Sequence, residues 1–517
     1  FGDLVTMAWW DDLWLNEGFA SWMQVKATRE LHPEWPAWAA RAARKQHAMD
    51  IDARRGTHAV IMHIDDASQT EGAFDTITYS KGEQVVRTLE SWMGEDAFRA
   101  GVRRYIARHA YGNTVTDDLW RALDEHAARP VRAIARDLTL QPGVPLVVEH
   151  EARCAGGRTE ATLSQDQFTV EGAHGGRWHV PVTLAVLGGG RASVVVDGPV
   201  PRRVVVPGCG LLVVNAGQSS YLRVRHSDAG LAALTAQFAR LDVDDQLGLL
   251  SDTQALALAG KLDIGALARL MRQAAAAADP SVTRMLVGQL TDLDGLHDGL
   301  ASQPAFRAFA RALLEPVFAR VGWQPAAGEP DAVATLRAEL VEALGGFDEP
   351  AVAAEAARRF KRFLADPASL QADLRGAVLA VVARRADAAT WDTLHGLARA
   401  APTPLAKAEL YQLLGRVRDR ALARRALALA ISGEPPATVA GELLRRIGAT
   451  HPGPTLDFVA RHWARVEPLF GAGAAATRLP PFSTGAHKRY ARVSSPSTFS
   501  ACGLSMVPRR RSWLSPR

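Results

Sequence analysis

Glu17 lies in an apolar, helix-like stretch, DDLWLNEGFASW, and is the first residue whose setting suggests chemistry. Its neighbours on the predicted helix face, Leu13, Ala20 and Ser21, are apolar or small and supply no cation. A carboxylate that is buried without a partner costs free energy. Glu17 is therefore either a capping or paired acid near a surface, or a buried ligand or catalytic group, and both interpretations remain open from this stretch alone.

Tyr79 is the second candidate and lies in the segment FDTITYSKGEQVV. The alternation of Ile77 and Tyr79 ahead of Gly82 predicts an extended segment that enters a helix. A tyrosine there can simply pack, or it can offer its hydroxyl as a hydrogen-bond donor. Taken alone, the segment favours packing.

The histidines and cysteines form no metal-binding pattern, although the chain has 15 of the first and 3 of the second. No pair of histidines forms HEXXH, and His58 and His63 lie in an extended-looking run, THAVIMHI, for which we expect structural roles. No CxxC occurs among Cys154, Cys209 and Cys502. A Cys154–Cys209 disulfide can form within one β-rich region, but we expect two free buried thiols.

The elements that must position Glu17 and Tyr79 are predicted to be helices joined by short loops. Asp11 and Asp12 can cap the helix that continues through Glu17. We expect residues 1–142 to form a mostly helical domain, with later helices at Gly82–Trp92, Glu95–Ala110 and Thr116–His126.

From about residue 144 the pattern changes to short runs of β-branched residues, separated by glycines and prolines. Turn signals at intervals of about 8–12 residues are typical of a small antiparallel β-sandwich, which we place at residues 143–227. The predicted strands are Val144–Val148, His179–Leu187, Ser193–Val196, Val204–Val206, Leu211–Val214 and Ser220–Arg225.

Residues 228–485 are rich in Ala, Leu and Arg, and their apolar residues recur with a helical period. The pair DAVATLRAELVEALGG and EPAVAAEAARRFKRFLADP is typical of a helical solenoid of the HEAT or armadillo kind. No residue repeats cleanly at a fixed interval, so a non-repetitive helical bundle remains an alternative. The expected fold class is multidomain α+β.

Residues 486–517 contain seven basic and no acidic residues, which accounts for the net charge of +5. The remaining 53 basic and 55 acidic residues nearly balance, and we therefore expect no nucleic-acid partner. The segment is predicted to be a disordered basic tail or an out-of-frame translation. The sequence contains no run of about 18 apolar residues, so we expect no transmembrane helix. The start, Phe1-Gly2-Asp3, does not resemble a signal peptide. We expect a soluble protein, cytoplasmic or exported.

The opening FGDLVTMAWWDDLWLNEGFASW closely resembles the segment that follows HEXXH in zinc aminopeptidases of the aminopeptidase N and puromycin-sensitive aminopeptidase type. FDTITYSKG resembles the Tyr-x-Lys-Gly block of that family. YGNTVTDDLWRAL and VNAGQSSYLRVRHS resemble its helical and β-sandwich signatures. The order of helical domain, sandwich and solenoid is also similar, so the resemblance extends over most of residues 1–485.

The resemblance implies a thermolysin-like catalytic domain in which Glu17 is the third ligand of one Zn²⁺ and Tyr79 is the catalytic tyrosine. Asn16, Asp12 and Asp11 become candidates for orienting the ligand, although we favour helix capping for the two aspartates. The implied reaction removes N-terminal amino acids from peptides with a free N-terminus, by attack of metal-activated water. HEXXH and the family's substrate-gripping GxMEN loop do not occur in these 517 residues. We therefore expect a C-terminal part of such an enzyme, unable to hold zinc properly or to hydrolyse peptides alone.

Two other functions remain open. A non-catalytic relative could use the solenoid as a scaffold for a partner, but a scaffold needs neither Glu17 nor Tyr79. The parent could instead resemble leukotriene A4 hydrolase, which combines peptidase and epoxide hydrolase chemistry. The predicted β-sandwich between the helical parts favours the aminopeptidase, because that hydrolase lacks it.

Overall fold

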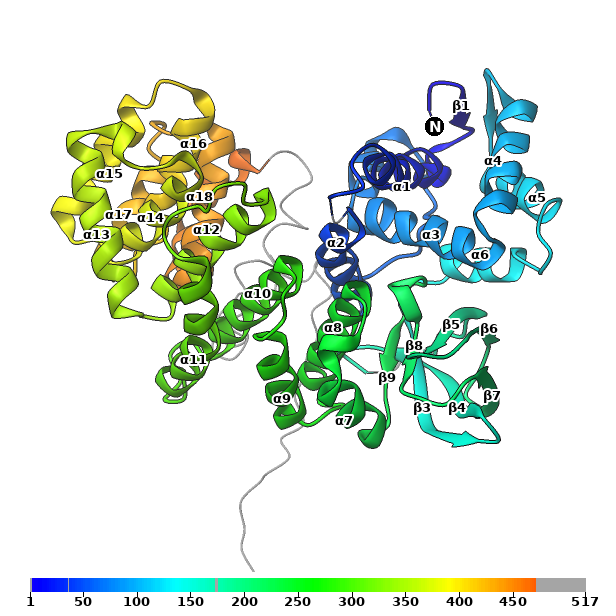
Figure 1. Cartoon of the computed structure of the whole chain (residues 1–517). Coiled ribbons are helices and arrows are strands. Elements are labelled where there is room, and N and C mark those ends of the chain that lie inside the picture. The colour runs from blue at the N-terminus through cyan, green and yellow to red at the C-terminus, as the bar shows by residue number, and fades with distance from the viewer. Residues whose placement is uncertain (1, 36, 173–174, 471–517) are drawn as a thin grey trace, which may run out of the picture. The chain divides into compact units, whose positions relative to one another are not determined.

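The computed structural model describes residues 2–35, 37–172 and 175–470. The chain divides into two compact units, one formed by Phe1–Leu290 with Ala312–Leu336, the other by Thr291–Arg311 with Arg337–Arg517 (Figure 1). The predicted tail, residues 486–517, lies outside the described residues, as does Cys502. No described helix has the length and apolar character needed to cross a membrane.

The first part of unit 1 is helical, as predicted, and the three later helices that the sequence predicts are confirmed to within two residues. Two short strands, β1 (Val5–Met7) and β2 (Gly112–Thr114), pair in parallel beside them. The helices and helical turns are η1 (Trp10–Asp12), α1 (Trp14–Leu31), α2 (Ala37–Asp52), η2 (Ala67–Ala73), η3 (Ile77–Lys81), α3 (Gly82–Met93), α4 (Glu95–His109), α5 (Thr116–Asp124) and α6 (Arg132–Leu140).

Two small sheets follow, one of four strands in the order β7-β4-β3-β9 and one of three in the order β6-β5-β8. The β3–β9 pair is parallel, with Leu146 opposite Arg223, so the expectation of a purely antiparallel sandwich is wrong for this pair. The strands are β3 (Val144–Ala155), β4 (Arg158–Phe168), β5 (Val180–Val186), β6 (Arg191–Val196), β7 (Arg202–Pro207), β8 (Leu212–Val214) and β9 (Arg223–Arg225).

Strand β4 is the one long strand that the sequence did not predict. Its outward-facing residues are polar or charged, but Thr159, Ala161 and Leu163 alternate with them and are buried. β4 pairs with β3 on one side and β7 on the other, so it holds the centre of its sheet.

Cys154 and Cys209 form a disulfide bond, so the expectation of two free buried thiols is wrong. Cys154 lies near the end of β3, Cys209 follows β7, and both residues are exposed. Their Cα atoms are 5.2 Å apart, within the ordinary range for a disulfide. The bond ties the outer end of the β3–β4 hairpin to the turn after β7.

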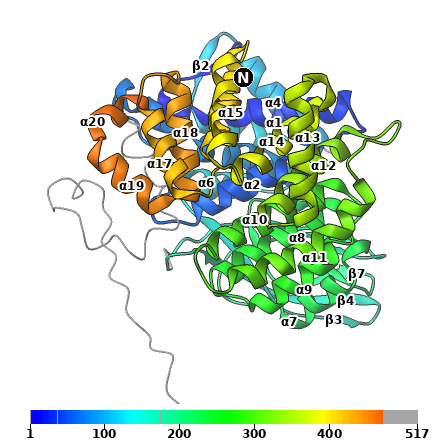
Figure 2. The same ribbon diagram turned by 90° about the vertical axis from the view of Figure 1, so that its left-hand side faces the viewer.

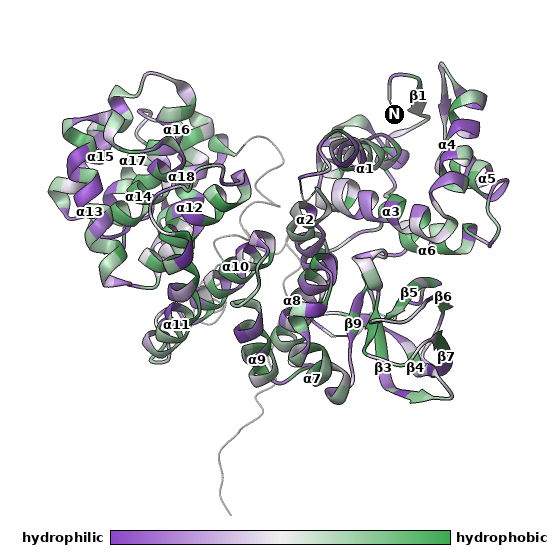
Figure 3. Cartoon of the chain, in the orientation of Figure 1, coloured by the Kyte–Doolittle hydropathy of each residue, from purple (hydrophilic) through white to green (hydrophobic). Residues whose placement is uncertain are grey.

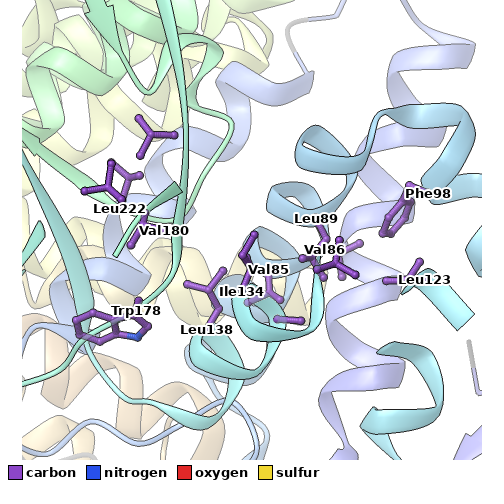
Figure 4. Packing of buried hydrophobic residues seen from close by; sticks show 14 of the residues in the cluster. Val85, Val86, Leu89, Phe98, Leu123, Ile134, Leu138, Trp178, Val180 and Leu222 are labelled. Atoms are coloured by element: carbon purple, nitrogen blue, oxygen red, sulfur yellow. The ribbon is translucent and has the colours of Figure 1, made fainter. Parts of the chain in front are cut away.

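A single hydrophobic core runs from the helices of unit 1 into the sheets. Figure 4 shows Val85 and Leu89 of α3 near Ile134 and Leu138 of α6, with Trp178 farther toward the strands. Because apolar burial is the main favourable contribution to folding, this continuity makes the helical part and the sandwich support each other.

The rest of unit 1 is helical and begins directly after the sandwich. It contains α7 (Asp228–Ala236), η5 (Phe238–Arg240), α8 (Val243–Leu258) and α9 (Ile264–Ala274), while α10 (Pro280–Leu296), α11 (Gln303–Val321) and α12 (Asp331–Gly346) give residues to both units.

Unit 2 is a succession of helices joined by short loops, and neighbours such as α17 and α18 lie side by side (Figures 1 and 2). Figure 3 shows hydrophobic (green) and hydrophilic (purple) residues alternating along the ribbon of these helices. The predicted α+β multidomain class with a helical C-terminal part is confirmed. The helices are α12 (Asp331–Gly346), α13 (Pro350–Ala365), α14 (Ala372–Arg384), α15 (Ala388–Ala400), α16 (Pro404–Leu414), α17 (Arg420–Ala430), α18 (Ala437–Thr450), α19 (Pro452–Arg461) and α20 (Trp463–Val466).

Candidate functional site

Glu17 lies in the first turn of α1, where its side chain is half-buried. Its neighbours Trp14, Leu15 and Phe19 are buried and fix the helix in the core of unit 1. A carboxylate near a helix N-terminus is favoured by the helix dipole. The sequence places Glu17 on a rigid element with its head group partly accessible.

Tyr79 lies in η3, which is a single π-helical turn rather than the extended segment that the alternation predicts. The Asp75 carboxylate accepts hydrogen bonds from the backbone N–H groups of Ile77 and Thr78, at 2.9 and 3.0 Å, and holds the start of this turn. Isolated π turns occur often at functional sites because they shift side chains off the regular helical register. Here the turn leads without a break into α3.

The structure brings the two candidate residues together. Burial of the Tyr79 hydroxyl, together with its interaction with the Glu17 carboxylate, raises the pKa of Tyr79 to about 12. The hydroxyl therefore stays protonated, and remains a donor, throughout the neutral pH range.

A close contact between two glycines makes this pairing possible. A Cβ atom on Gly18 would lie only 2.9 Å from the carbonyl carbon of Gly82 and 3.1 Å from its Cα atom. Each glycine follows a motif residue, Glu17 in one case and Lys81 in the other. The absent side chains let α1 approach the junction of η3 and α3.

A buried ion pair anchors the turn that carries Tyr79. Lys81 and Asp52 have fully buried side chains, and Lys81 Nζ lies 2.8 Å from Asp52 Oδ2. Three further donors reach the same carboxylate: the Gly143 N–H at 2.7 Å, the Thr57 hydroxyl at 2.7 Å and the Tyr221 hydroxyl at 3.0 Å. Gly143 and Tyr221 flank strands of the sandwich, so this cluster joins the helical part of unit 1 to its sheets.

His58 supports the other end of the turn, in keeping with the structural role expected for it. Its Nε2 lies 2.8 Å from Asp75 Oδ2 and its Nδ1 lies 2.7 Å from the Ala59 carbonyl oxygen. Both ring nitrogens thus face acceptors, and the hydrogen bond to Asp75 raises the pKa of His58. Glu17 and Tyr79 therefore rest on Asp75, His58 and the Lys81–Asp52 pair, of which the sequence singled out only Lys81 and His58.

Asp11 and Asp12 do not cap α1, so the capping interpretation is wrong. Asp12 Oδ1 accepts hydrogen bonds from the N–H and the hydroxyl of Thr116, at the start of α5. Asp11 binds the Ile64 N–H at 2.8 Å and the ring of His63 at 2.9 Å. Both acids tie the entry of α1 to distant segments.

Asn16, the other candidate for orienting a ligand, is half-buried beside Gly2, where its Nδ2 lies 3.4 Å from the position of a Cβ on that glycine. Its role toward Glu17 stays a prediction.

Metal binding by these residues alone does not fit the geometry. Within the described ranges, no three side chains of His, Cys, Asp or Glu lie close enough to hold an ion. Glu17 offers a single carboxylate, which is paired with Tyr79. Catalytic zinc needs three protein ligands and an open position, so the part of the chain that the structure describes supplies at most one of them.

Two family models match the chain: the peptidase family M1 domain over residues 1–138, and the ERAP1-like C-terminal domain over residues 211–495. Aminopeptidase M1 of Arabidopsis thaliana is 31% identical over 418 residues, which cover 75% of this chain and 46% of that protein. Aminopeptidase M1-A of Oryza sativa subsp. japonica is 29% identical over 491 residues, 91% of this chain and 55% of that protein. Aminopeptidase 2 of Candida albicans is 29% identical over 410 residues, which cover 77% of this chain and 44% of that protein. The chain spans about half the length of these relatives.

Proposed function

The chain belongs to peptidase family M1, and we propose that it supplies Glu17 and Tyr79 to the active site of a zinc aminopeptidase that acts on peptides with a free N-terminus. The observation that carries the proposal is that these two side chains, from separate motifs 62 positions apart, lie close enough for the Glu17 carboxylate to raise the pKa of Tyr79. In the family resemblance they are one zinc ligand and the catalytic tyrosine.

The role proposed for Tyr79 follows from its state of protonation. An amide carbonyl attacked by water develops negative charge on its oxygen, and a neutral phenol is a good donor toward such an oxyanion. The raised pKa of Tyr79, about 12, keeps the proton on the hydroxyl. The Tyr79 hydroxyl can turn from the Glu17 carboxylate to the substrate oxygen once another group binds that carboxylate.

Glu17 is the proposed zinc ligand, and bound zinc would take the place of Tyr79 as the group that the Glu17 carboxylate contacts. Zinc would supply an activated water molecule and would polarise the scissile carbonyl. Because the described residues contribute only one ligand, the two histidines and the general base implied by HEXXH have to come from outside these 517 residues. We therefore propose that the 517-residue chain alone is inactive.

The test has two stages. The purified 517-residue chain is assayed with an aminoacyl arylamide in the presence of Zn²⁺, and we expect no hydrolysis that a chelator abolishes. Chelator-sensitive turnover would contradict the proposed division of the site.

The coding sequence upstream of Phe1 is then read. HEXXH and GxMEN there would support the enzyme, whereas degenerate versions of both would favour the scaffold. In a protein extended by that sequence, Tyr79→Phe should lower kcat by about 10²–10³ with little change in KM. The control is Tyr111→Phe, which removes a hydroxyl from a residue that is 88% exposed.

A further inference from the structure

A row of arginines lies in unit 2, at the end of α14, in the loop between α16 and α17, and on α18. The row consists of Arg384, Arg385, Arg416, Arg418, Arg445 and Arg446. Its members are neighbours: the N–H of Arg418 donates to the Arg384 carbonyl oxygen at 3.2 Å, and the Cβ of Arg446 lies 3.3 Å from the Cβ position of Gly415.

Four of the six arginines are held by carboxylates of the same unit. The Asp348 carboxylate forms ion pairs with Arg418 and Arg385. It also pairs with Arg307, whose Nη1 lies 2.7 Å from Asp348 Oδ2. Glu342 binds Arg416, and Glu442 binds Arg445. These acids leave the row with more positive than negative charge, because one aspartate serves three arginines.

Arg384 and Arg446 are the two that remain without a partner. Among the described residues, neither side chain has a hydrogen bond or an ion pair, and the Nε of each is buried. Burial, and after it the guanidinium groups of Arg418 and Arg307, lower the pKa of Arg384 to about 10, while Asp294 and Asp348 act in the opposite direction. For Arg446, burial and Arg416 lower the pKa, and Glu442 and Glu342 oppose them. A partly buried cation that forms no direct ion pair costs free energy.

The rest of the chain cannot supply the missing carboxylates from its undescribed residues. Residues 471–517 contain no aspartate and no glutamate, and neither do residues 1, 36, 173 and 174. The nearby acid Asp419 is already engaged, because its carboxylate accepts the N–H groups of Ala421 and Leu422 at 2.8 Å.

We propose that this arginine row is a docking surface for an acidic polypeptide segment, whose Asp and Glu side chains pair with Arg384 and Arg446. Carboxylates are the anions that the row already binds at Arg416 and Arg418, and the planar guanidinium fork matches them in two-point contacts. The row offers several guanidinium groups close to one another, which suits a segment bearing several carboxylates.

The experiment measures binding of a fluorescent glutamate-rich peptide, with an amidated C-terminus, to the 517-residue chain by anisotropy. We expect saturable binding that weakens as salt rises. The double variant Arg384→Gln/Arg446→Gln should bind about ten- to a hundredfold more weakly. The matched control is Arg399→Gln/Arg424→Gln, which removes two exposed arginines from α15 and α17 and should keep wild-type affinity.

An equal loss of peptide affinity in both double variants would show that binding depends only on the overall charge of the protein, and it would overturn the proposal. Inorganic phosphate or a short single-stranded DNA that displaces the peptide at equal charge concentration would overturn it too. Thermal melting supplies an independent measure, because removing two cations that form no direct ion pair should not lower the Tm of the Arg384→Gln/Arg446→Gln variant. A large fall in its Tm would assign these arginines to the fold and contradict a docking role.

Discussion

Gly18 and Gly82 meet backbone to backbone, and no side chain separates the helix that carries Glu17 from the turn that carries Tyr79. This contact requires glycine at position 18, because a Cβ there would lie 2.9 Å from the Gly82 carbonyl carbon, and it leaves a Cβ at position 82 only 3.3 Å from the Gly18 Cα atom. The contact therefore sets the distance across which Tyr79 reaches Glu17.

Replacing Gly18 by alanine should destabilise unit 1 by about 1–3 kcal/mol, because the added methyl would lie 2.9 Å from the Gly82 carbonyl carbon. The measurement is urea unfolding followed by tryptophan fluorescence. The control is Gly288→Ala in α10, an exposed glycine with no atom within 4 Å of its Cβ position. There alanine should stabilise the helix by about 0.5–1 kcal/mol. A Gly18→Ala protein as stable as the wild type would show that the contact is not tight in solution.

Helix positions were predictable because apolar periodicity is a local property of the sequence. The segments that became α3, α4 and α5 also carry recognisable turns between them. Strand β4 was not predictable in the same way, since its polar residues mask the alternation of its buried ones. The parallel β3–β9 pair joins segments more than 70 residues apart, which no local pattern reveals.

Within the site, the motif residues were predictable and their supports were not. Asp52 is an ordinary acid at the end of a helix until the fold brings Lys81, Gly143 and Tyr221 around it. Asp12 looks like a helix cap in sequence, yet its carboxylate accepts a hydrogen bond from Thr116, which lies 104 positions away. Such partners depend on tertiary packing and not on neighbouring residues.

Breaking the buried pair by Lys81→Met should cost about 3–5 kcal/mol, because the Asp52 carboxylate would stay buried without its cation. Adding Asp52→Asn should recover part of this loss, since the amide oxygen still accepts from Gly143 without a charge. The free energy of unfolding of unit 1 is the quantity compared. Lys26→Met, at a partly exposed ion pair with Glu90, is the control and should cost no more than about 1 kcal/mol. Equal effects at Lys26 and Lys81 would contradict the anchoring role.

The His58–Asp75 contact should make stability depend on pH. The pKa of His58 is raised in the folded protein by its hydrogen bond to Asp75, above the value of about 6.5 expected in the unfolded chain. Its contribution is therefore complete below about pH 6.5 and is lost as the pH rises through the folded pKa. His58→Gln should lower the Tm most at acidic pH, and the difference in Tm between the variant and the wild type should become smaller above neutral pH. His126→Gln, at an exposed position, is the control and should leave the pH profile of the Tm unchanged.

The Cys154–Cys209 bond predicts a specific thiol count. In the native protein at most one thiol per chain should react with a thiol reagent, because two of the three cysteines are bonded to each other, and all three should react after reduction and unfolding. Reduction should also lower the unfolding free energy by about 2–4 kcal/mol, because the bond closes a loop between positions 55 apart. A Cys502→Ser variant should show no native thiol, and three reactive thiols in the folded wild type would refute the pairing.

The strongest check on the candidate site is the titration of Tyr79 itself. In the wild-type chain its pKa of about 12 results from burial first and then from the Glu17 carboxylate, which holds the phenol proton. Glu17→Gln removes the negative charge, so the pKa of Tyr79 should fall toward the ordinary value of about 10. The measurement is NMR of ring-labelled tyrosine as the pH is raised, with Tyr79→Phe used to assign the resonance. Glu30→Gln, which removes an exposed charge from the same helix, should leave the pKa of Tyr79 where it is. A wild-type Tyr79 that already titrates near the ordinary value would mean that the two motifs do not meet as described. The neutral donor on which the proposed oxyanion contact depends would then lose its support.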